Sequence, residues 1–536
     1  MPNPTEEMKN DLKRLFERAD IRVALCLFVC IASAYLLVMN GDIRSDGLYH
    51  YMAASHLVKG EAPVVEDPRY VDHRTPLDVR GERTVQYGIG WTATLMPVVA
   101  VCDLFCGRLG LPPDNKLLRI VVSSSTSFIS TATAALLYLV LRKLGYRRRT
   151  CVLTAFLLAF STMLWTYSRG DLWTEPVTAL AITAALLAAV QYRESGGAAS
   201  AFFSGLFVAY LLTIKIFWLF IVVPFVVFLF WDPSRRNART LGAFFLPFVG
   251  AFAAVCLYNK LRFGVFMAEG YLGGALTLES IRSAMSGQPV VSGLYRLLLS
   301  PGKSVLFFNP PVILALLGAR QFWRKSREVA LFCLIVVGGY VLFFASRPVL
   351  EGSYVWGPRH LTSLLPVMML PVAHLIDRSG ARPVAVRILV IVVLVAGIVI
   401  QFPNLFLYPK MITTAMFFEG VLNEDEIYYV PDRCPIVANW VLLKNGLLNF
   451  VTGEPLFYYP TKIVEGNVEL LRPLYLPDFA DVWDSWINIV RRAGYMRVLT
   501  VKLAVFAVIG LLICAAIAAG IEISRTLRFA ADEEYS

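Results

Sequence analysis

The chain has 536 residues, of which 57% are hydrophobic and only 17% are charged, and its mean hydropathy is +0.61. Because soluble domains average about 25% charged residues, this composition excludes an ordinary soluble protein and predicts an all-α polytopic membrane protein. The formal net charge of +11 does not indicate nucleic-acid binding, since the Lys and Arg residues lie in small groups between apolar runs, as in cytoplasmic loops.

The first apolar run, 21–39, follows a basic N-terminal segment that we expect to stay in the cytoplasm. It therefore delivers the charged first loop, 40–91, to the outer face. The next apolar run, 89–105, is predicted to be a helix that lies along the outer interface. If this run crossed the membrane, the basic segment 142–149 (RKLGYRRR), which is the strongest orientation signal in the chain, would lie on the wrong side.

Later apolar runs bring the prediction to about 12 transmembrane spans with both termini in the cytoplasm. The other spans are predicted at 118–141, 151–167, 176–190, two short spans within 201–231, 241–257, 305–317, 329–344, 361–375, 388–407 and 498–520. Lys215 is predicted to lie at an outer turn between the two short spans, because a lysine in the middle of a lipid-facing span costs roughly 3 kcal/mol.

The predicted membrane topology divides the chain into three regions. Residues 1–407 form the predicted transmembrane catalytic region, which includes the first loop. Residues 408–496 are rich in acids, prolines and aromatic residues, which predicts a small folded segment on the outer face rather than a disordered linker. Residues 497–536 contain the last span and a cytoplasmic tail.

The polar residues of the outer loops all fall on one face of the membrane. They are Arg44, Asp46, Tyr49, His50, Arg169, Asp171, Glu175, Lys215, Lys260, Arg262, Glu269, Lys303, Arg359 and His360. One carboxylate with several cations suits the attack of a hydroxyl acceptor on a sugar that is carried by a lipid phosphate. The carboxylate takes the acceptor's proton, and the cations stabilise the leaving phosphate. A glycosidase would instead need a second carboxylate as general acid.

Seven stretches of sequence follow one another in a recognisable order over most of 42–371. They are SDGLYHYMAASHLVKGE, VQYGIGWTATLMP, WTYSRGDLWTEP, LLTIKIFWLFIVVP, LYNKLRFGVFMAEGY, LLLSPGKSVLFFNPP and VWGPRHLTSLLP. The ordered set resembles the C superfamily of polytopic glycosyltransferases, which contains protein O-mannosyltransferases and the lipid A aminoarabinose transferase.

The resemblance implies a polyprenyl-phosphate sugar donor and a hydroxyl acceptor on a lipid, a glycan or a protein. It also implies an inverting transfer on the periplasmic or extracellular face, in a protein of the bacterial inner (plasma) membrane that contacts membrane lipids. Such enzymes place a catalytic acid in the first outer loop, which makes Asp46 the expected general base. Many relatives have Asp-Glu at this point, whereas Gly47 follows Asp46 in this chain.

Several of these residues also have a simpler structural interpretation. Asp46 follows Ser45 at the start of a predicted helix and could cap that helix. Asp171 and Glu175 are four residues apart near a span boundary, and they could cap or solvate the helix instead of contacting sugar hydroxyls. Lys303, in SPGKS, could hold a lipid phosphate at a helix N-terminus, although the glycine spacing of a phosphate-binding loop is missing.

Arg359 and His360 begin an apolar span, and their side chains could simply extend to the membrane interface. The histidines of the first loop raise the question of a metal site. A cluster of Asp46 with His50, His56 and His73 has no recognised ligand pattern, so we expect no metal ion and no other cofactor.

Two other functions remain compatible with the sequence. A transporter or flippase of lipid-linked anionic substrates would place charged residues at mid-bilayer depth, where Lys215 is the main candidate. A polymerase or ligase of lipid-linked glycans would share the donor chemistry, and the outer segment 408–496 keeps that hypothesis open.

Overall fold

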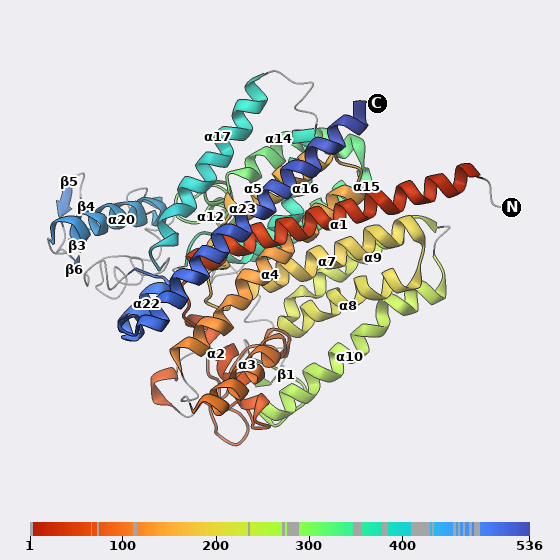
Figure 1. Cartoon of the computed structure of the whole chain (residues 1–536). Helices are drawn as coiled ribbons and strands as arrows, with labels where there is room; N and C mark the ends of the chain where they lie inside the picture. Colours follow the sequence, from red (N-terminus) through yellow and green to blue (C-terminus); the bar gives the residue numbers. More distant parts are fainter. Residues whose placement is uncertain are drawn as a thin grey trace.

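The protein is described here by a computed structural model. It covers residues 4–65, 67–71, 74–110, 115–233, 236–270, 274–275, 289–346, 355–377, 384–408, 429–430, 434–453, 457–458, 461–464, 467–470, 474–475 and 483–535. Within these residues the chain is a bundle of helices whose axes are broadly aligned, with smaller elements gathered at one end (Figure 1). The fold is that of an all-α multi-pass membrane protein, as predicted.

The helices of the bundle are α1 (Pro4–Val38), α4 (Lys116–Lys143), α5 (Arg148–Phe160), α6 (Met163–Tyr167), α7 (Thr174–Ser195), α8 (Ala198–Ile214), η2 (Ile216–Ile221), α9 (Val222–Leu229), α10 (Ala238–Phe263), α14 (Pro311–Lys325), α15 (Arg327–Ala345), α16 (Leu365–Asp377), α17 (Val384–Gln401) and α23 (Leu499–Tyr535). The remaining helices are α2 (Ser45–Val58), η1 (Pro68–Tyr70), α3 (Ile89–Leu109), α12 (Val290–Leu298), α13 (Val305–Phe308), η5 (Arg359–Leu364), η7 (Phe402–Leu405), α20 (Pro435–Thr452), α22 (Trp486–Arg492) and η9 (Tyr495–Arg497).

The described strands form three short antiparallel pairs. They are β1 (Ala268–Glu269) with β2 (Gly274–Ala275), β3 (Phe457–Tyr458) with β6 (Leu474–Tyr475), and β4 (Thr461–Val464) with β5 (Asn467–Leu470). The last two pairs and α20 belong to the predicted outer segment 408–496 and lie together beside the bundle in Figure 1. This segment therefore contains secondary structure of its own.

Nine of the described helices are long and apolar enough to cross a membrane. All but one coincide with predicted spans, and the exception is α3, which the sequence assigns to the interface. The remaining predicted spans fall on shorter helices, namely α5 with α6, α8, α9, and α13 with α14. α3 packs against α2, α4 and α8 (Figure 1), and its interfacial placement remains a prediction.

The structure confirms the predicted break at Lys215. α8 ends at Ile214, Lys215 itself is extended with φ −149° and ψ 128°, and η2 begins at Ile216. The side chain of Lys215 is buried inside the protein. Two short helices separated by this residue avoid placing an ammonium group against lipid.

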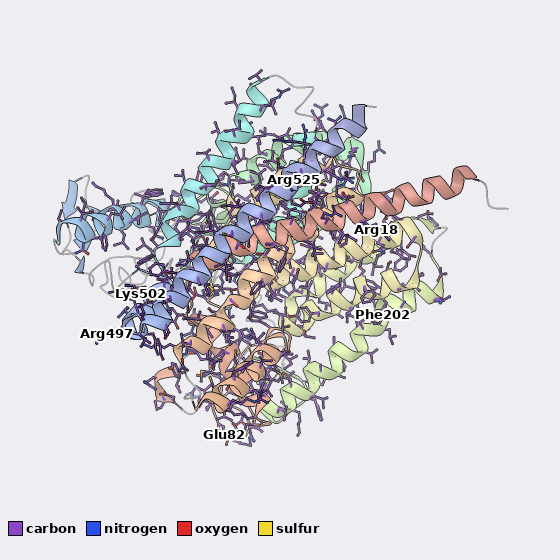
Figure 2. The ribbon with its side chains drawn as sticks, in the orientation of Figure 1. Arg18, Glu82, Phe202, Arg497, Lys502 and Arg525 are labelled. Carbon is purple, nitrogen blue, oxygen red and sulfur yellow. The ribbon has the colours of Figure 1, made fainter. Side chains whose placement is uncertain are left out.

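The two ends of the bundle differ in the charges they collect. At one end Asp20 Oδ1 lies 3.0 Å from Arg142 Nε and 2.8 Å from Arg148 Nε, so the start of the first span meets the basic segment 142–149. Figure 2 places Arg18 and Arg525 toward this end and Glu82 and Arg497 toward the other. The first loop and the basic segment 142–149 therefore lie at opposite ends of the bundle, as the predicted membrane topology requires.

The helices that carry polar side chains at the other end are the most enclosed. Within a continuous apolar stretch of 18 residues in α7, 83% of the residues are buried. The corresponding share is 89% for the span 359–377, which combines η5 and α16. For α10 and α23 the share is 11%, so these two helices lie on the perimeter, where apolar side chains suit a lipid environment. The candidate site residues described below come from these enclosed helices and from the loops at the same end of the bundle.

Close packing of α8 on α10 depends on a glycine. A Cβ atom at Gly205 would lie 1.9 Å from the carbonyl oxygen of Phe244, so Gly205→Ala must push the two helices apart. We expect a loss of about 1–3 kcal/mol in the free energy of unfolding, measured as a lower midpoint of thermal unfolding in detergent.

Gly242 provides the matched control, because a Cβ there would meet no described atom within 4 Å. Gly242→Ala should leave the unfolding midpoint unchanged or raise it slightly, since alanine is the better helix former. Equal midpoints for the Gly205→Ala variant and the unsubstituted protein would contradict the packing described here.

Candidate active site

Asp46 lies in the first turn of α2, at the start of the first loop. The residue that precedes the helix is Arg44, and its side chain makes no capping hydrogen bond to the described backbone. The Asp46 carboxylate turns instead to two arginines: Oδ2 is 3.0 Å from Arg359 Nη1 and Oδ1 is 3.5 Å from Arg74 Nη1. Both oxygens of the Asp46 carboxylate therefore face cations.

Arg359 is the first residue of η5, directly after the turn 355–358, and it meets Asp46 across more than three hundred residues of sequence. Lys303 Nζ donates to the carbonyl oxygens of Val355 and, at 3.2 Å, of Gly357. Gly357 has φ +54°, and a Cβ there would lie 2.4 Å from Met163 Sδ, so the turn requires glycine. Lys303 is 1% exposed, and its ammonium group builds this turn rather than an open phosphate site.

Glu175, near the start of α7, is the second carboxylate of the site. Its Oε1 atom is 3.4 Å from Arg359 Nε, 3.1 Å from His360 Nδ1 and 3.8 Å from Lys215 Nζ. Arg359 thus bridges Asp46 and Glu175. We call Asp46, Arg74, Glu175, Lys215, Arg359 and His360 the ion-pair cluster.

Aromatic residues frame the Asp46 side of the cluster. Tyr87 forms a side-chain hydrogen bond with Asp46, and its ring centroid lies 4.7 Å from that of His50. The guanidinium of Arg74 lies 4.6 Å above the ring of Tyr49. His50 Nδ1 is 3.0 Å from the hydroxyl of Thr92, and burial lowers the pKa of His50 to about 3, so this histidine is neutral.

The charges of the cluster determine the protonation state of Asp46. Burial alone would raise the pKa of Asp46, but Arg359, the hydrogen bond from Tyr87, Lys215 and Arg74 together hold it well below its usual value. Asp46 is therefore ionised at neutral pH. Among the described ion pairs of the cluster three cations face two carboxylates, and guanidinium and ammonium groups are the usual partners of an anionic ligand such as a phosphate.

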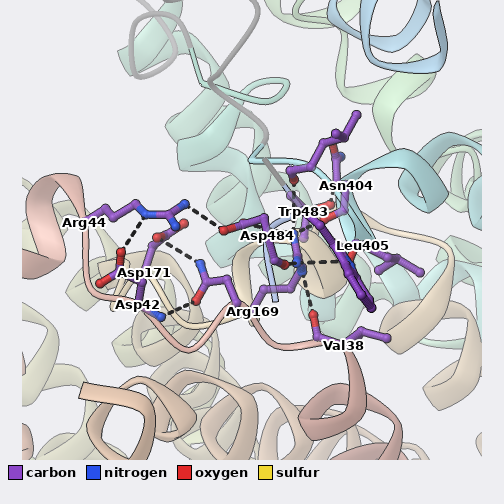
Figure 3. Close-up of polar contacts among 12 residues, drawn as sticks. Val38, Asp42, Arg44, Arg169, Asp171, Asn404, Leu405, Trp483 and Asp484 are labelled. Atoms are coloured by element: carbon purple, nitrogen blue, oxygen red, sulfur yellow. Dashed lines mark hydrogen bonds and ion pairs between the residues drawn. The ribbon is translucent and has the colours of Figure 1, made fainter. Parts of the chain in front are cut away.

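A second polar network lies beside the cluster and contains three residues that the sequence assigns to substrate binding (Figure 3). Arg169 is 2% exposed. Its guanidinium donates to the carbonyl oxygens of Val38 (2.9 Å), Leu405 (3.1 Å), Leu407 (3.2 Å) and Asn404, and to Asp484. These acceptors take up the donors of Arg169, so its contacts are structural.

Arg44 and Asp171 belong to the same network (Figure 3). Arg44 Nη1 is 2.8 Å from Asp484 Oδ1, and Asp171 Oδ1 accepts a hydrogen bond of 3.0 Å from Asn40. Burial and the carboxylates of Asp484 and Asp42 raise the pKa of Asp171 to about 7, against the opposing effect of the nearby arginines. Asp171 also lines a cavity of about 10 Å³, which has room for one water molecule.

Three further sequence-predicted residues lie in the last turn of α10 and in β1. Arg262 donates to the carbonyl oxygens of Val85 (2.9 Å) and Tyr87 (2.6 Å), and it thereby supports the segment that carries Tyr87. Lys260 is exposed and donates to the carbonyl oxygen of Gly264, at the end of its own helix. Glu269 lies in β1, and its side chain lies outside the described residues.

The histidines of the first loop are the candidate metal ligands of the sequence, although no metal ion is expected there. In the part of the chain that the structure describes, no group of three or more His, Cys, Asp or Glu side chains lies close enough to hold a metal ion. His56 pairs with Glu61 at 3.3 Å, away from Asp46, and His73 lies outside the described residues.

The structure also adds residues that sequence reasoning missed. Arg74 and Tyr87 contact Asp46, and Asp484 joins Arg44 to Arg169. Tyr87 lies within VQYGIGW, a stretch that already resembled the glycosyltransferases, so its tyrosine was a usable signal. Arg74 and Asp484 carried no comparable signal, because each is one of several charged residues in a long loop.

Asp171 offers a direct test of these electrostatics. Because its pKa is raised to about 7, Asp171 should be ionised at pH 9 and protonated at pH 5. We expect the infrared carbonyl stretch of a protonated carboxyl group to grow as the pH falls through 7 and to be absent in Asp171→Asn.

Asp46→Asn is the control for this measurement, because the pKa of Asp46 is held low and the residue contributes no protonated band in the same pH range. A band that disappears in Asp46→Asn and persists in Asp171→Asn would show that the two environments have been assigned the wrong way round.

Part of the chain is similar to a known protein family, and the fold is similar to that of a solved enzyme structure. No curated protein matches the chain. A family model described as dolichyl-phosphate-mannose-protein mannosyltransferase matches residues 120–257. A crystal structure of ArnT from Cupriavidus metallidurans in the apo state has a TM-score of 0.48 and 13% identity, covering 95% of this chain and 75% of that one.

The crystal structure of the same enzyme bound to undecaprenyl phosphate has a TM-score of 0.40 and 15% identity, covering 78% of this chain and 75% of that chain. The family match spans α4 to α10 and includes Glu175 and Lys215 of the ion-pair cluster. Over residues 120–257 the match agrees with the predicted resemblance to polytopic glycosyltransferases.

Proposed function

We propose that this protein is a membrane glycosyltransferase that moves a sugar from a polyprenyl-phosphate donor to a hydroxyl group on a lipid, a glycan or a protein, with Asp46 as general base. The observation that carries the proposal is the ion-pair cluster, in which one accessible carboxylate lies among three cations. The side chain of Asp46 is 18% exposed and that of Glu175 only 3%, so Asp46 is the carboxylate that a substrate can reach.

In this mechanism the acceptor hydroxyl gives its proton to Asp46 while its oxygen attacks the anomeric carbon of the sugar. The bond between that carbon and the phosphate oxygen breaks, and its electron pair leaves with the phosphate. Arg359, Arg74 and Lys215 stabilise the charge that develops on the phosphate. A single displacement of this kind inverts the anomeric carbon and needs no general acid.

The low pKa of Asp46 fits this order of events. With its arginines in place Asp46 is a weak base, because the cations stabilise its ionised form. A donor phosphate binds the same cations and competes with Asp46 for them. The carboxylate then loses part of this stabilisation, and its pKa rises toward the range useful for proton transfer.

Two buried polar atoms support a ligand rich in hydroxyl groups. Among the described side chains, His50 Nε2 and Glu175 Oε2 are buried and have no hydrogen-bond partner. A buried polar atom without a partner costs about 1–3 kcal/mol, and a sugar hydroxyl can both donate and accept. A sugar bound beside Asp46 would satisfy atoms that the protein leaves unpaired.

The active site is proposed to face the outside of the bacterial inner membrane, with both termini in the cytoplasm. The support is the opposite placement of the basic segment 142–149 and the first loop along the bundle, together with the positive-inside rule. A polyprenyl-phosphate donor is supported by the description of the matching family, whose members use a dolichyl phosphate.

Asp46→Asn tests the role of the base. We expect transfer to fall by about 10²–10⁴-fold, because the amide cannot take the acceptor's proton, while binding of undecaprenyl phosphate is retained or strengthened. The measurement is sugar release from a radiolabelled polyprenyl-phosphate donor by the purified protein in nanodiscs, with binding followed separately.

Glu61→Gln is the matched control in the same loop, since Glu61 pairs with His56 and its side chain is 58% exposed. Its activity should match that of the unsubstituted protein. Full activity in Asp46→Asn would remove Asp46 from the mechanism, and Glu175 would then have to be tested.

Arg74→Gln tests the recognition of the phosphate. Arg74 is the more exposed of the two arginines on Asp46, with 21% of its side chain exposed against 10% for Arg359, so its loss should damage folding less. We expect the dissociation constant of undecaprenyl phosphate to rise about tenfold, since a hydrogen bond to a charged group contributes about 1.5–3 kcal/mol.

Arg69→Gln is the control for this variant, because Arg69 lies in the same loop, pairs with Asp67 and has 79% of its side chain exposed. Its dissociation constant should not change. If both variants weaken binding equally, the effect reflects the general charge of the loop rather than a phosphate site at Asp46.

A further inference from the structure

The start of α2 has an unfavourable backbone conformation. Ser45 has φ 53°, in the left-handed region that non-glycine residues rarely adopt, and it directly precedes Asp46. On the other side of Asp46, a Cβ atom at Gly47 would lie 1.9 Å from the carbonyl oxygen of Asp171. A turn of this kind persists only where neighbouring groups hold it, so the direction of the Asp46 carboxylate depends on those groups.

Arg44 is the residue through which this turn is held. Its Nε atom lies 3.0 Å from Asp42 Oδ2 and its Nη1 atom 2.8 Å from Asp484 Oδ1, and its guanidinium lies 4.8 Å above the ring of Tyr408. Asp42 belongs to the same loop as Arg44 and can move with it. Asp484 comes from the opposite end of the chain and can hold the loop against the rest of the protein (Figure 3).

Asp484 is itself firmly fixed. Its side chain is 2% exposed, and its Oδ2 atom is 3.4 Å from Arg169 Nη1. Its backbone N–H donates to the carbonyl oxygen of Phe406 at 2.7 Å, and its own carbonyl oxygen accepts from Arg169. The carboxylate therefore presents one oxygen to Arg169 and the other to Arg44.

The residues after Asp484 tie the same segment to the end of α1. The backbone N–H of Trp486 donates to the carbonyl oxygen of Met39 at 3.1 Å, and its indole Nε1 donates to that of Leu36 at 3.0 Å. A Cβ atom at Gly41 would lie 2.4 Å from the Cβ of Trp486, so the two chains are in direct contact. The start of the first loop thus lies between α1 and the segment 483–486.

We infer that Asp484 is a positioning residue: through its ion pair with Arg44 it holds the start of the first loop in the conformation that presents Asp46 to the ion-pair cluster. The outer segment that precedes the last helix is then a part of the catalytic apparatus and not only an appended domain. The inference rests on the proposed function only for the role of Asp46, since the contacts that hold the loop are independent of the reaction.

Asp484→Asn and Arg44→Gln test the inference from its two sides. The first readout is amide hydrogen exchange of residues 41–48 in nanodiscs without any donor. Each variant should exchange there about tenfold faster, and the double variant should be no faster than either one, because both remove the same ion pair. Exchange in α7 and α16 should remain unchanged.

Glu522→Gln is the matched control, because Glu522 lies in the same C-terminal part of the chain and pairs with Arg22 at the opposite end of the bundle, at 3.8 Å. It should leave exchange in 41–48 unchanged. Unchanged exchange in Asp484→Asn would overturn the inference. So would faster exchange throughout the protein together with a lower unfolding midpoint, because Asp484 would then only support the fold.

The second readout is the transfer reaction. A displaced Asp46 should lower kcat by about tenfold in Asp484→Asn and leave KM for the donor unchanged, since Arg74 and Arg359 still bind the phosphate. A higher KM with unchanged kcat would overturn the positioning role. The exchange measurement needs no activity, so it still decides the inference if Asp46→Asn proves fully active and the proposed base is wrong.

Discussion

The site depends on a single arginine that joins two carboxylates from distant parts of the chain. Arg359 meets Asp46 of the first loop at 3.0 Å and Glu175 of α7 at 3.4 Å, and only a tenth of its side chain is exposed. A charge buried to this degree must be paired, because an unpaired one would cost several kcal/mol. The first loop, the start of α7 and the turn before η5 must therefore remain together. The turn before η5 is itself held by Lys303, whose ammonium group donates to the carbonyl oxygens of Val355 and Gly357.

The cations at this end of the bundle divide into two groups according to what they bind. Arg169, Arg262 and Lys303 donate mainly to backbone carbonyl oxygens, and they hold loops in place. Arg74 and Arg359 face carboxylates, which an incoming phosphate can replace as partners. In the proposed mechanism Arg74 and Arg359 exchange their carboxylate partners for the donor phosphate, whereas Arg44, which also pairs with carboxylates, holds the first loop.

Two segments from opposite ends of the sequence, the end of α1 and the residues before α23, contact the start of the first loop. α1 and α23 pack side by side (Figure 1), and this brings the segment before α23 to the end of α1, where the loop begins. Asp484 and Trp486 in that segment meet Arg44 and Met39. The strained turn at Ser45, beside the proposed catalytic residue, is tolerated because several independent contacts determine its conformation.

The sequence by itself determined the membrane class, the positions of most long apolar helices and the break at Lys215. It also predicted that Asp46, Glu175, Arg359 and His360 lie on one face, since hydropathy and charge depend on composition along the chain. Tertiary structure decided which of those residues meet. It placed Arg169 and Lys303 among backbone carbonyls, paired Asp46 with Arg359, and brought in Arg74, Tyr87 and Asp484. Contacts between loops depend on how helices pack, and a pattern within one segment carries no information about the distance to another.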